Sequence, residues 1–231
     1  MIGNELLFLM QVVVVIAACK FCQQVGSCAL TSWLSIQVLL ANLLVLKMVN
    51  LFGLEVTVSD VYSIGSLYCL NVLSESHGRL RAKYAVLTSF VLVFVVVGMF
   101  CLHLAFIPSG DGKESILYQQ LLGQVWPIML ISNLIFVLVQ LFDYVVFGFL
   151  QSRYGHYRFA FRVMMSIGLT QILDTGLFTY WALSGLGVNF WNVFIWSYGL
   201  KMLITLMISA GSGLAWGRLT GMKRWVEYVQ V

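Results

Sequence analysis

Two short stretches of this sequence place a glutamine and an aspartate at the same spacing inside apolar surroundings. They are QLFDYVVF, from Gln140 to Phe147, and QILDTGLF, from Gln171 to Phe178. In a helix, residues three positions apart lie on one face, so each stretch would present an amide and a carboxylate together. Such a pair can accept and donate hydrogen bonds, which is the chemistry needed to bind a polar small molecule.

The composition places these motifs in a membrane protein. Of the 231 residues, 61% are hydrophobic and only 10% are charged, and the mean hydropathy is +0.93. Soluble domains have about 25% charged residues. Apolar stretches near the roughly 18 to 20 residues that cross a bilayer recur along the whole chain, which leaves no room for a soluble domain. We therefore predict an all-α membrane protein with a single transmembrane domain over residues 1–231.

Two interpretations of the paired motifs follow. An ionisable residue deep in a membrane costs at least about 2.5 to 3.5 kcal/mol, so it marks either a function or a buried partner. In the structural interpretation, Asp143 or Asp174 pairs with Lys201, and the glutamines form hydrogen bonds between helices. In the functional interpretation, the motifs line a polar cavity, helped by the neighbouring hydroxyl side chains Ser166, Thr170 and Thr175. The repetition of the motif favours the cavity.

About seven transmembrane segments can be placed along the chain. They lie at about 4–19, 28–49, 57–77, 84–107, 125–150, 160–184 and 190–216. The first segment ends in IAAC, from Ile16 to Cys19, which resembles a lipoprotein cleavage site. However, Met1 to Glu5 contains no lysine or arginine, whereas signal peptides begin with a positive region. We expect this segment to be a retained helix.

The basic residues assign the two sides of the membrane, because cytoplasmic loops carry an excess of lysine and arginine. Ten basic residues follow segments one, three, five and seven: Lys20, Arg79, Arg81, Lys83, Arg153, Arg158, Arg162, Arg218, Lys223 and Arg224. The other side has Lys113 alone, beside Asp111 and Glu114 in the longest predicted loop. The amino terminus should therefore lie outside and the carboxyl terminus in the cytoplasm of a multi-pass protein of the inner (cell) membrane.

With this topology the two motifs lie at similar depth. Segment five descends toward the cytoplasm and segment six returns. Gln140 is then roughly ten residues, and Gln171 about eleven, from the inner end of its own segment. Asp143 lies nearer the cytoplasm and Asp174 nearer the midplane. The motifs are expected to face each other across an antiparallel helix pair.

A second polar cluster ends the third segment, in NVLSESHGRLRAK from Asn71 to Lys83. Asn71 and Glu75 are one helical turn apart and are expected to line the same cavity. Gly78 is expected to end the helix. The basic residues that follow should complement the helix dipole and contact anionic lipid.

Four stretches occur in an order typical of one family. They are ANLLVLKMVNLFGLEV from Ala41 to Val56, NVLSESHGRLRAK, QLFDYVVF, and FRVMMSIGLTQILDT from Phe161 to Thr175. Together they resemble the queuosine precursor transporters, a vitamin-uptake-like membrane family, over roughly residues 41–209. The resemblance implies a six-helix core over about 28–216, similar to the substrate-binding subunits of energy-coupling-factor transporters. The helix at about 4–19 would be an extra one outside that core.

The family's motif positions correspond in this sequence to Asn42, Lys47, Gly53, Glu75, Gly78, Gln140, Asp143, Arg162, Ser166, Gln171, Asp174 and Thr175. Departures from the family pattern bear on substrate preference. Asn71 stands where many relatives have aspartate. Asn133 and Phe136 follow Ser132 where relatives tend to have alanine or leucine and then Ala-Tyr.

The resemblance implies the import of a 7-deazaguanine base, such as queuine or its aminomethyl or nitrile precursor. The substrate-binding residues it implies are Asn71, Glu75, Gln140, Asp143, Ser166, Gln171, Asp174 and Lys201. One carboxylate can accept hydrogen bonds from N1–H and the exocyclic amine of the ring, while O6 needs a donor such as a glutamine amide or Lys201. We assign the ring edge to Asp174. Asp143 is assigned the ammonium arm, which the nitrile lacks.

No catalysis, cofactor, metal or nucleic-acid partner is implied, and the expected partners are the substrate and membrane lipid. An intramembrane enzyme is a weaker alternative, because H-E-x-x-H and G-x-S-x-G patterns are absent from the sequence. A substrate-capture subunit is another, because the sequence has no phosphate-binding loop and would need a separate ATP-driven module. The sequence leaves open the energy source, whether the protein forms a homo-oligomer and whether it needs an energising module.

Overall fold

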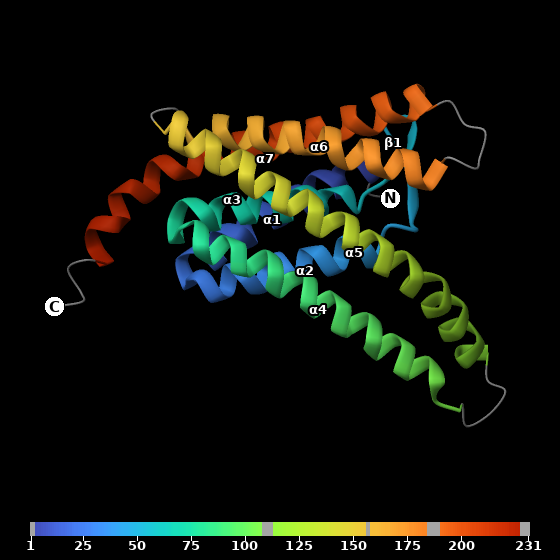
Figure 1. The fold of residues 1–231 in the computed structure, drawn as a ribbon. Helices are drawn as coiled ribbons and strands as arrows, with labels where there is room; N and C mark the ends of the chain where they lie inside the picture. The colour runs from blue at the N-terminus through green and yellow to red at the C-terminus, as the bar shows by residue number, and fades with distance from the viewer. Residues whose placement is uncertain (1–2, 108–112, 156–157, 184–189, 227–231) are drawn as a thin grey trace.

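The structure is a computed structural model that describes residues 3–107, 113–155, 158–183 and 190–226. Within these residues the chain forms seven α-helices and one β-hairpin (Figure 1). The elements are α1 (Asn4–Val25), α2 (Ser27–Leu43), β1 (Met48–Leu51), β2 (Leu54–Thr57), α3 (Asp60–His77), α4 (Arg79–Ala105), α5 (Lys113–Arg153), α6 (Phe159–Leu183) and α7 (Phe190–Val226). The all-α fold predicted from the composition is confirmed.

Four of the described helices are long and apolar enough to cross a bilayer. They are α1, α4, the stretch Ile116–Arg153 of α5 and the stretch Phe194–Gly211 of α7, while Ser27–Leu43 is a shorter apolar helix. Large apolar side chains are exposed on these helices, among them Val13, Phe94, Leu138 and Ile195. Apolar surface of this extent belongs in lipid, so the chain is a multi-pass membrane protein.

The central helix of the bundle is α3. It contacts each of the other six helices, and 13 of its 18 residues are buried, polar ones such as Ser66 and Asn71 included. A helix that is surrounded by protein can carry polar side chains, because these face other helices and not lipid. This position explains how a helix with so many polar residues is held inside an apolar bundle.

A β-hairpin replaces the end of the predicted second segment. Helix α2 ends at Leu43 and not at 49, and β1 pairs antiparallel with β2 so that Leu51 lies opposite Leu54. Phe52 and Gly53 between them have φ angles of 53° and 78°, as in tight two-residue hairpin turns. With only four residues in each strand, hydrophobic periodicity could not separate the hairpin from a helix end.

Helix α5 is longer than predicted. It begins at Lys113 and not near 125, so it includes Glu114, which the sequence predicts to lie in a loop. Asp111 lies outside the described residues. The additional stretch, KESILYQQLLGQ, contains many polar residues, and hydropathy detects only the apolar part of a helix. Pro127 lies inside α5, where a proline removes one helical hydrogen bond.

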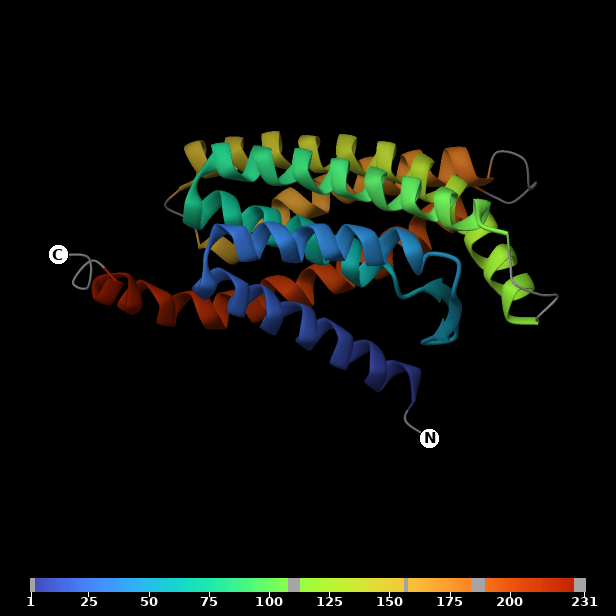
Figure 2. The ribbon, with the colours of Figure 1, turned by 90° about the horizontal axis from the view of Figure 1, so that it is seen from below.

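The bundle has two distinct ends (Figures 1 and 2). We call the end that carries β1 and β2, where α6 ends and α7 begins, the hairpin end. We call the opposite end, where α3 is followed by α4 and α5 by α6, the basic end. Its residues include Arg79, Arg81, Lys83, Arg153 and Arg158. Helix α1 starts at the hairpin end and packs against α2, α3 and α7.

Candidate functional site

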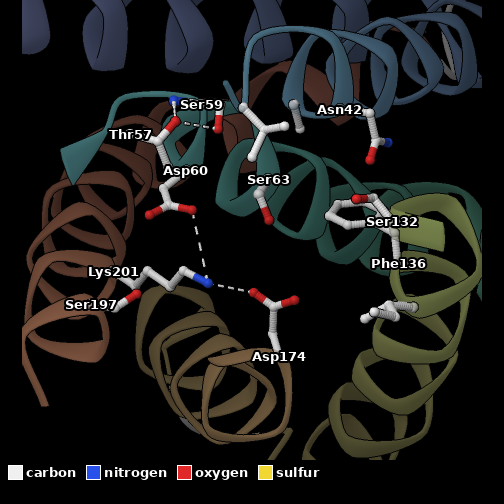
Figure 3. A pocket seen from close by; sticks show the side chains of 13 residues that line it. Asn42, Thr57, Ser59, Asp60, Ser63, Ser132, Phe136, Asp174, Ser197 and Lys201 are labelled. Carbon is white, nitrogen blue, oxygen red and sulfur yellow. Dashed lines mark hydrogen bonds and ion pairs between the residues drawn. The ribbon is translucent and has the colours of Figure 1, made fainter. Parts of the chain in front are cut away.

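A polar cavity lies in the hairpin half of the bundle, between α2, α3, α5, α6 and α7 (Figure 3). The centre of a water molecule can move through about 100 Å³ of it, several times the space that one buried water needs. The lining residues are Ala41, Asn42, Val45, Thr57, Ser59, Asp60, Ser63, Ser132, Ile135, Phe136, Asp174, Ser197 and Lys201. A small polar molecule can therefore be held inside an otherwise apolar bundle.

Lys201 of α7 lies between two carboxylates at this cavity (Figure 3). Its Nζ is 2.5 Å from Oδ2 of Asp174 on α6 and 3.8 Å from Oδ1 of Asp60 on α3. Only 6%, 12% and 16% of the side chains of Lys201, Asp174 and Asp60 are exposed. In their ionised forms, two carboxylates and one ammonium leave an excess of one negative charge. No other charged residue is among the described residues that line the cavity, so it favours a cationic ligand.

Asp60 is a charged residue of the cavity lining that the sequence did not predict. It is the first residue of α3, where the helix dipole favours a negative charge. The hydroxyls of Thr57 and Ser59, on the same wall, lie 2.8 Å apart and share a hydrogen bond. A signal was present, because Asp60 falls inside the predicted hydrophobic segment 57–77, where an acid needs a partner. Its partner Lys201 is too distant in sequence for residue spacing to reveal the contact.

The wall opposite Lys201 is formed by α2 and α5 (Figure 3). Asn42 donates its Nδ2 to the carbonyl of Val38 at 2.8 Å, which leaves its Oδ1 as the atom available to a ligand. Ser132 and Phe136, one turn apart on α5, add a hydroxyl and an aromatic ring. A charged wall opposite an aromatic residue suits a flat polar ring.

Asp143 is completely buried and is not part of the cavity lining. Its Oδ1 accepts hydrogen bonds from Ser166 at 2.7 Å and from Thr170 at 3.1 Å, both on α6. Asn71 of α3 lies next to this carboxylate. The motif of α5 therefore faces α6.

Several buried polar atoms around Asp143 have no hydrogen-bond partner in the part of the chain that the structure describes. They are both amide atoms of Asn71 and of Gln171, Nε2 of Gln140, Oδ2 of Asp143 and the hydroxyl of Thr175. The other amide atom of Gln140, Oε1, is 3.4 Å from the Ser89 hydroxyl that donates to it. A buried polar group without a partner costs about 1 to 3 kcal/mol. The middle of the bundle is therefore a polar region with unused hydrogen-bonding capacity.

Glu75 and Arg162 form a bidentate ion pair at the basic end. Nη1 and Nη2 of Arg162 donate to Oε2 and Oε1 of Glu75 at 2.8 and 2.7 Å. Gln151 also donates to Oε2, at 3.0 Å, so these contacts join α3, α5 and α6. Nearby, α3 ends at Gly78 with a φ of 92°, a conformation that favours glycine. The prediction that Gly78 ends the helix is confirmed.

The predicted site residues lie at three levels of the bundle. Asp174 and Lys201 line the cavity and pair with each other, as the structural interpretation of Lys201 predicts. Asn71, Gln140, Asp143, Ser166 and Gln171 lie in the buried middle. Glu75 lies at the basic end with Arg162, away from the cavity lining.

The two glutamines lie at similar depth in the bundle, as the sequence predicts. Gln140 lies 13 residues (140 to 153) before the end of α5, and Gln171 lies 12 residues (159 to 171) after the start of α6. At 1.5 Å per residue these positions are about 20 and about 18 Å from the basic end. By the same count, Asp143 is nearer the basic end and Asp174 nearer the hairpin end.

Apolar helices that surround a polar helix and a polar cavity define a multi-pass membrane protein with an internal site for a polar molecule. Residues 57–211 match the profile of a family described as "putative vitamin uptake transporter", and the chain belongs to this family. It is 27% identical over 214 residues to a Bacillus subtilis (strain 168) protein named "probable queuosine precursor transporter", covering 90% of this chain and 92% of that protein. No solved structure matches the chain. The family resemblance is confirmed, while the likeness of the core to energy-coupling-factor subunits stays a prediction.

Proposed function

We propose that this protein imports a queuosine precursor, a 7-deazaguanine base, and prefers precursors with an ammonium arm over the nitrile. The name of the Bacillus subtilis relative supports the class of substrate. The single observation that carries the preference is the position of Lys201 between Asp174 and Asp60 at a polar cavity. Two acids and one ammonium match a base that has adjacent N–H donors, a carbonyl oxygen and a cationic arm. The base is transported without chemical conversion.

In this proposal the hairpin end faces the outside and the basic end the cytoplasm. The turns after α3 and α5 both lie at the basic end, and basic residues mark the cytoplasmic side of membrane proteins. Asp174 lies 15 residues (159 to 174) after the start of α6, about 22 Å from the basic end. The cavity then lies in the outer half of the membrane, where the substrate is collected.

In this proposal Asp174 binds the edge of the base that carries N1–H and the exocyclic amine. Its Oδ2 accepts a hydrogen bond from Lys201, while its Oδ1 accepts none from the described residues. A substrate N–H can therefore bind Oδ1, and the adjacent exocyclic amine can share the carboxylate in the bidentate manner of a guanidinium. Lys201, beside Asp174, is in position to donate to O6 of the same ring.

Asp60 takes the ammonium arm. Its Oδ1 is 3.8 Å from Nζ of Lys201, beyond hydrogen-bond distance, so its charge is only partly compensated. An ammonium arm completes the compensation, whereas a nitrile leaves one excess negative charge in a desolvated site. The sequence assigned the arm to Asp143, and that assignment stays a prediction. Because Asp143 is 0% exposed, the arm could reach it only after a rearrangement.

Phe136 provides the aromatic contact for the flat ring. Stacking of a base on an aromatic side chain contributes about 1 to 3 kcal/mol in nucleic-acid proteins. Phe136 lines the cavity and is one of the positions where this sequence departs from the family pattern. We expect substrate preference within the family to vary with this residue.

The remaining predicted residues form the route from the cavity to the basic end. Asn71, Gln140, Ser166 and Gln171 supply polar atoms in the buried middle. Glu75, paired with Arg162, closes the route at the basic end.

Uptake of labelled queuine and of both simpler precursors tests the proposal. The host cells should be unable to make or import these bases and should lack an energy-coupling-factor module. Expression of the chain should give accumulation of the two ammonium precursors, and less of the nitrile. Asp174→Asn should lose uptake of all three, while Glu5→Gln, which changes an exposed carboxylate of α1, should behave like the parent.

Two results would contradict the proposal. If the protein is present in the membrane and no precursor is taken up, the substrate class is wrong. If uptake occurs only after an ATP-driven module is added, the chain is a substrate-capture subunit and not a transporter by itself.

A further inference from the structure

Asp143 is a buried carboxylate without a counter-ion. It has no exposed surface, and no lysine, arginine or histidine in the described part of the chain lies within the 4.0 Å of an ion pair. Oδ1 accepts hydrogen bonds from the hydroxyls of Ser166 and Thr170, but Oδ2 has no hydrogen-bond partner among the described residues. By contrast, Asp174, Asp60 and Glu75 each face a lysine or arginine. Asp143 therefore needs a positive charge from outside the protein's own side chains.

The charged groups on the surrounding helices are too distant or already paired. Helices α2, α3, α4 and α6 pack against α5, and α2 carries no charged residue. Toward the basic end, Arg162 is paired with Glu75, and Arg79 lies 4.8 Å from the ring centre of Tyr144. Toward the hairpin end, Asp174 is paired with Lys201. An ionised carboxylate in this position lacks compensation, which makes its burial costly.

We infer that Asp143 is a proton-binding site, occupied in this conformation, that couples substrate import to proton entry. The coupling to substrate import rests on the proposed function, whereas proton binding by Asp143 does not. A protonated carboxyl group is neutral and satisfies the local hydrogen bonds. Its carbonyl oxygen Oδ1 accepts from Ser166 and Thr170, while protonation of Oδ2 removes the charge that has no counter-ion. Asn71, both of whose amide atoms have no partner among the described residues, lies next to this carboxyl group.

A proton fits this site better than a metal cation. Sodium sites in transporters use backbone carbonyls that are freed where a helix is broken. Here α5 and α6 run without interruption past Asp143 and Ser166, so their carbonyls are engaged in helical hydrogen bonds. The two hydroxyls act as donors to the carboxylate. The site thus has the donors that an acid's carbonyl needs and lacks the convergent oxygens that sodium needs.

A route for the proton leads along α6 from the cavity. Asp174 lines the cavity, and Gln171 and Thr170 are about one turn nearer Asp143 on the same helix. Both amide atoms of Gln171 are buried without a partner, so Gln171 can hold a water or pass a proton. In the transport cycle a proton from the outer side binds Oδ2 of Asp143, and the same proton is released from that oxygen to water at the basic end.

Infrared spectroscopy of the purified full-length protein tests proton binding without any substrate. A buried carboxylic acid gives a carbonyl stretch distinct from that of a carboxylate, and the band shifts in D₂O. We expect this band in the parent at neutral pH, its loss in Asp143→Asn and its retention in Glu5→Gln. Ser166→Ala keeps the acid but removes one hydrogen bond to Oδ1, so the band should move to higher frequency. Absence of the band in the parent, or its survival in Asp143→Asn, would overturn the inference.

Transport in proteoliposomes tests the coupling. With the lumen one pH unit more alkaline than the bath and the membrane potential held at zero, symport of one proton allows at most about tenfold accumulation. The parent should approach this limit, whereas Asp143→Asn should exchange substrate across the membrane but accumulate it no more than onefold. Accumulation by Asp143→Asn equal to that of the parent would refute the coupling. Selective loss of the ammonium precursors, with the nitrile retained, would instead make Asp143 the arm reader and also refute it.

Two further outcomes separate this inference from the proposed function. If the parent neither binds nor moves any precursor, the proposed substrate is wrong, and the infrared band alone decides whether Asp143 binds a proton. If sodium raises the melting temperature of the parent but not of Asp143→Asn, and the band is missing, the site binds sodium and the inference is wrong.

Discussion

Replacing Asp174 with asparagine should weaken the binding of all three precursors, because every one of them presents the same ring edge. A hydrogen bond to a charged group contributes about 1.5 to 3 kcal/mol, which corresponds to roughly 10- to 150-fold in dissociation constant. Only 12% of the Asp174 side chain is exposed, so solvent screens the interaction little. We therefore expect the upper half of this range, about 50- to 150-fold, for Asp174→Asn.

The matched substitution Asp60→Asn should weaken only the binding of precursors that have an ammonium arm. It should weaken binding of queuine and the aminomethyl precursor by roughly 10- to 150-fold, the range for a hydrogen bond to a charged group, because only 16% of the Asp60 side chain is exposed. Binding of the nitrile should be unchanged or improved. The ion pair between Lys201 and Asp174 stays intact in this variant, so its melting temperature should change less than that of Asp174→Asn.

Competition of each unlabelled precursor against labelled queuine, on purified protein in detergent, measures these changes. Thermal melting checks folding, and Glu5→Gln serves as the control. If Asp174→Asn binds all three compounds like the parent, the carboxylate does not read the ring edge and the reasoning fails. Equal weakening of the nitrile and the amines by Asp60→Asn would show that Asp60 shapes the cavity without reading the arm.

Two further predictions concern the basic end and the topology. From its expected place in the cavity lining, Glu75→Gln would be predicted to reduce uptake strongly and to leave the amount of protein in the membrane nearly unchanged. The ion pair changes this expectation, because Arg162 would keep a buried charge without its partner, at a cost of about 3 to 5 kcal/mol. We expect a clearly lower melting temperature, and an unchanged one would contradict the structural role of the pair. A cysteine at Phe52, in the exposed hairpin turn, should react with an impermeant reagent in intact cells, and one at Arg81 should not. Gly112, which the sequence also predicts to be outside, lies beyond the described residues, and labelling at Arg81 alone would reverse the assigned sides.

The sequence was sufficient for the features that depend on local pattern. Hydropathy predicted the membrane class, and the exit of α3 followed from Gly78. Counting residues from the ends of segments five and six gave the similar depth of Gln140 and Gln171, because helical rise is constant. What failed were the elements whose pattern is short or polar. The hairpin has strands too short for periodicity, and the first turns of α5 are not apolar enough for hydropathy to detect.

The partners of the polar residues could not be predicted, because each depends on how distant helices pack. The sequence considered Asp143 and Asp174 as equal candidates for Lys201, and only the packing of α6 against α7 decides for Asp174. The packing of α3 against α7 brings Asp60 to Lys201. The sequence predicts that Glu75 lies with Asn71, because the two share a face of α3. In the structure, Glu75 pairs with Arg162 at the basic end, while Asn71 lies in the buried middle.

The polar residues of α3 also limit how the bundle can assemble. Asp60 contacts Lys201, while Glu75 takes hydrogen bonds from Gln151 and Arg162, which lie 76 and 87 residues further along the chain. Until α5, α6 and α7 are in place, these carboxylates have no partner, and an unpaired acid in the bilayer costs at least about 2.5 to 3.5 kcal/mol. Helix α3 can therefore acquire its central position only when the later helices close around it. Substitutions in α6 or α7 that remove a partner should consequently impair the insertion of a helix synthesised long before them.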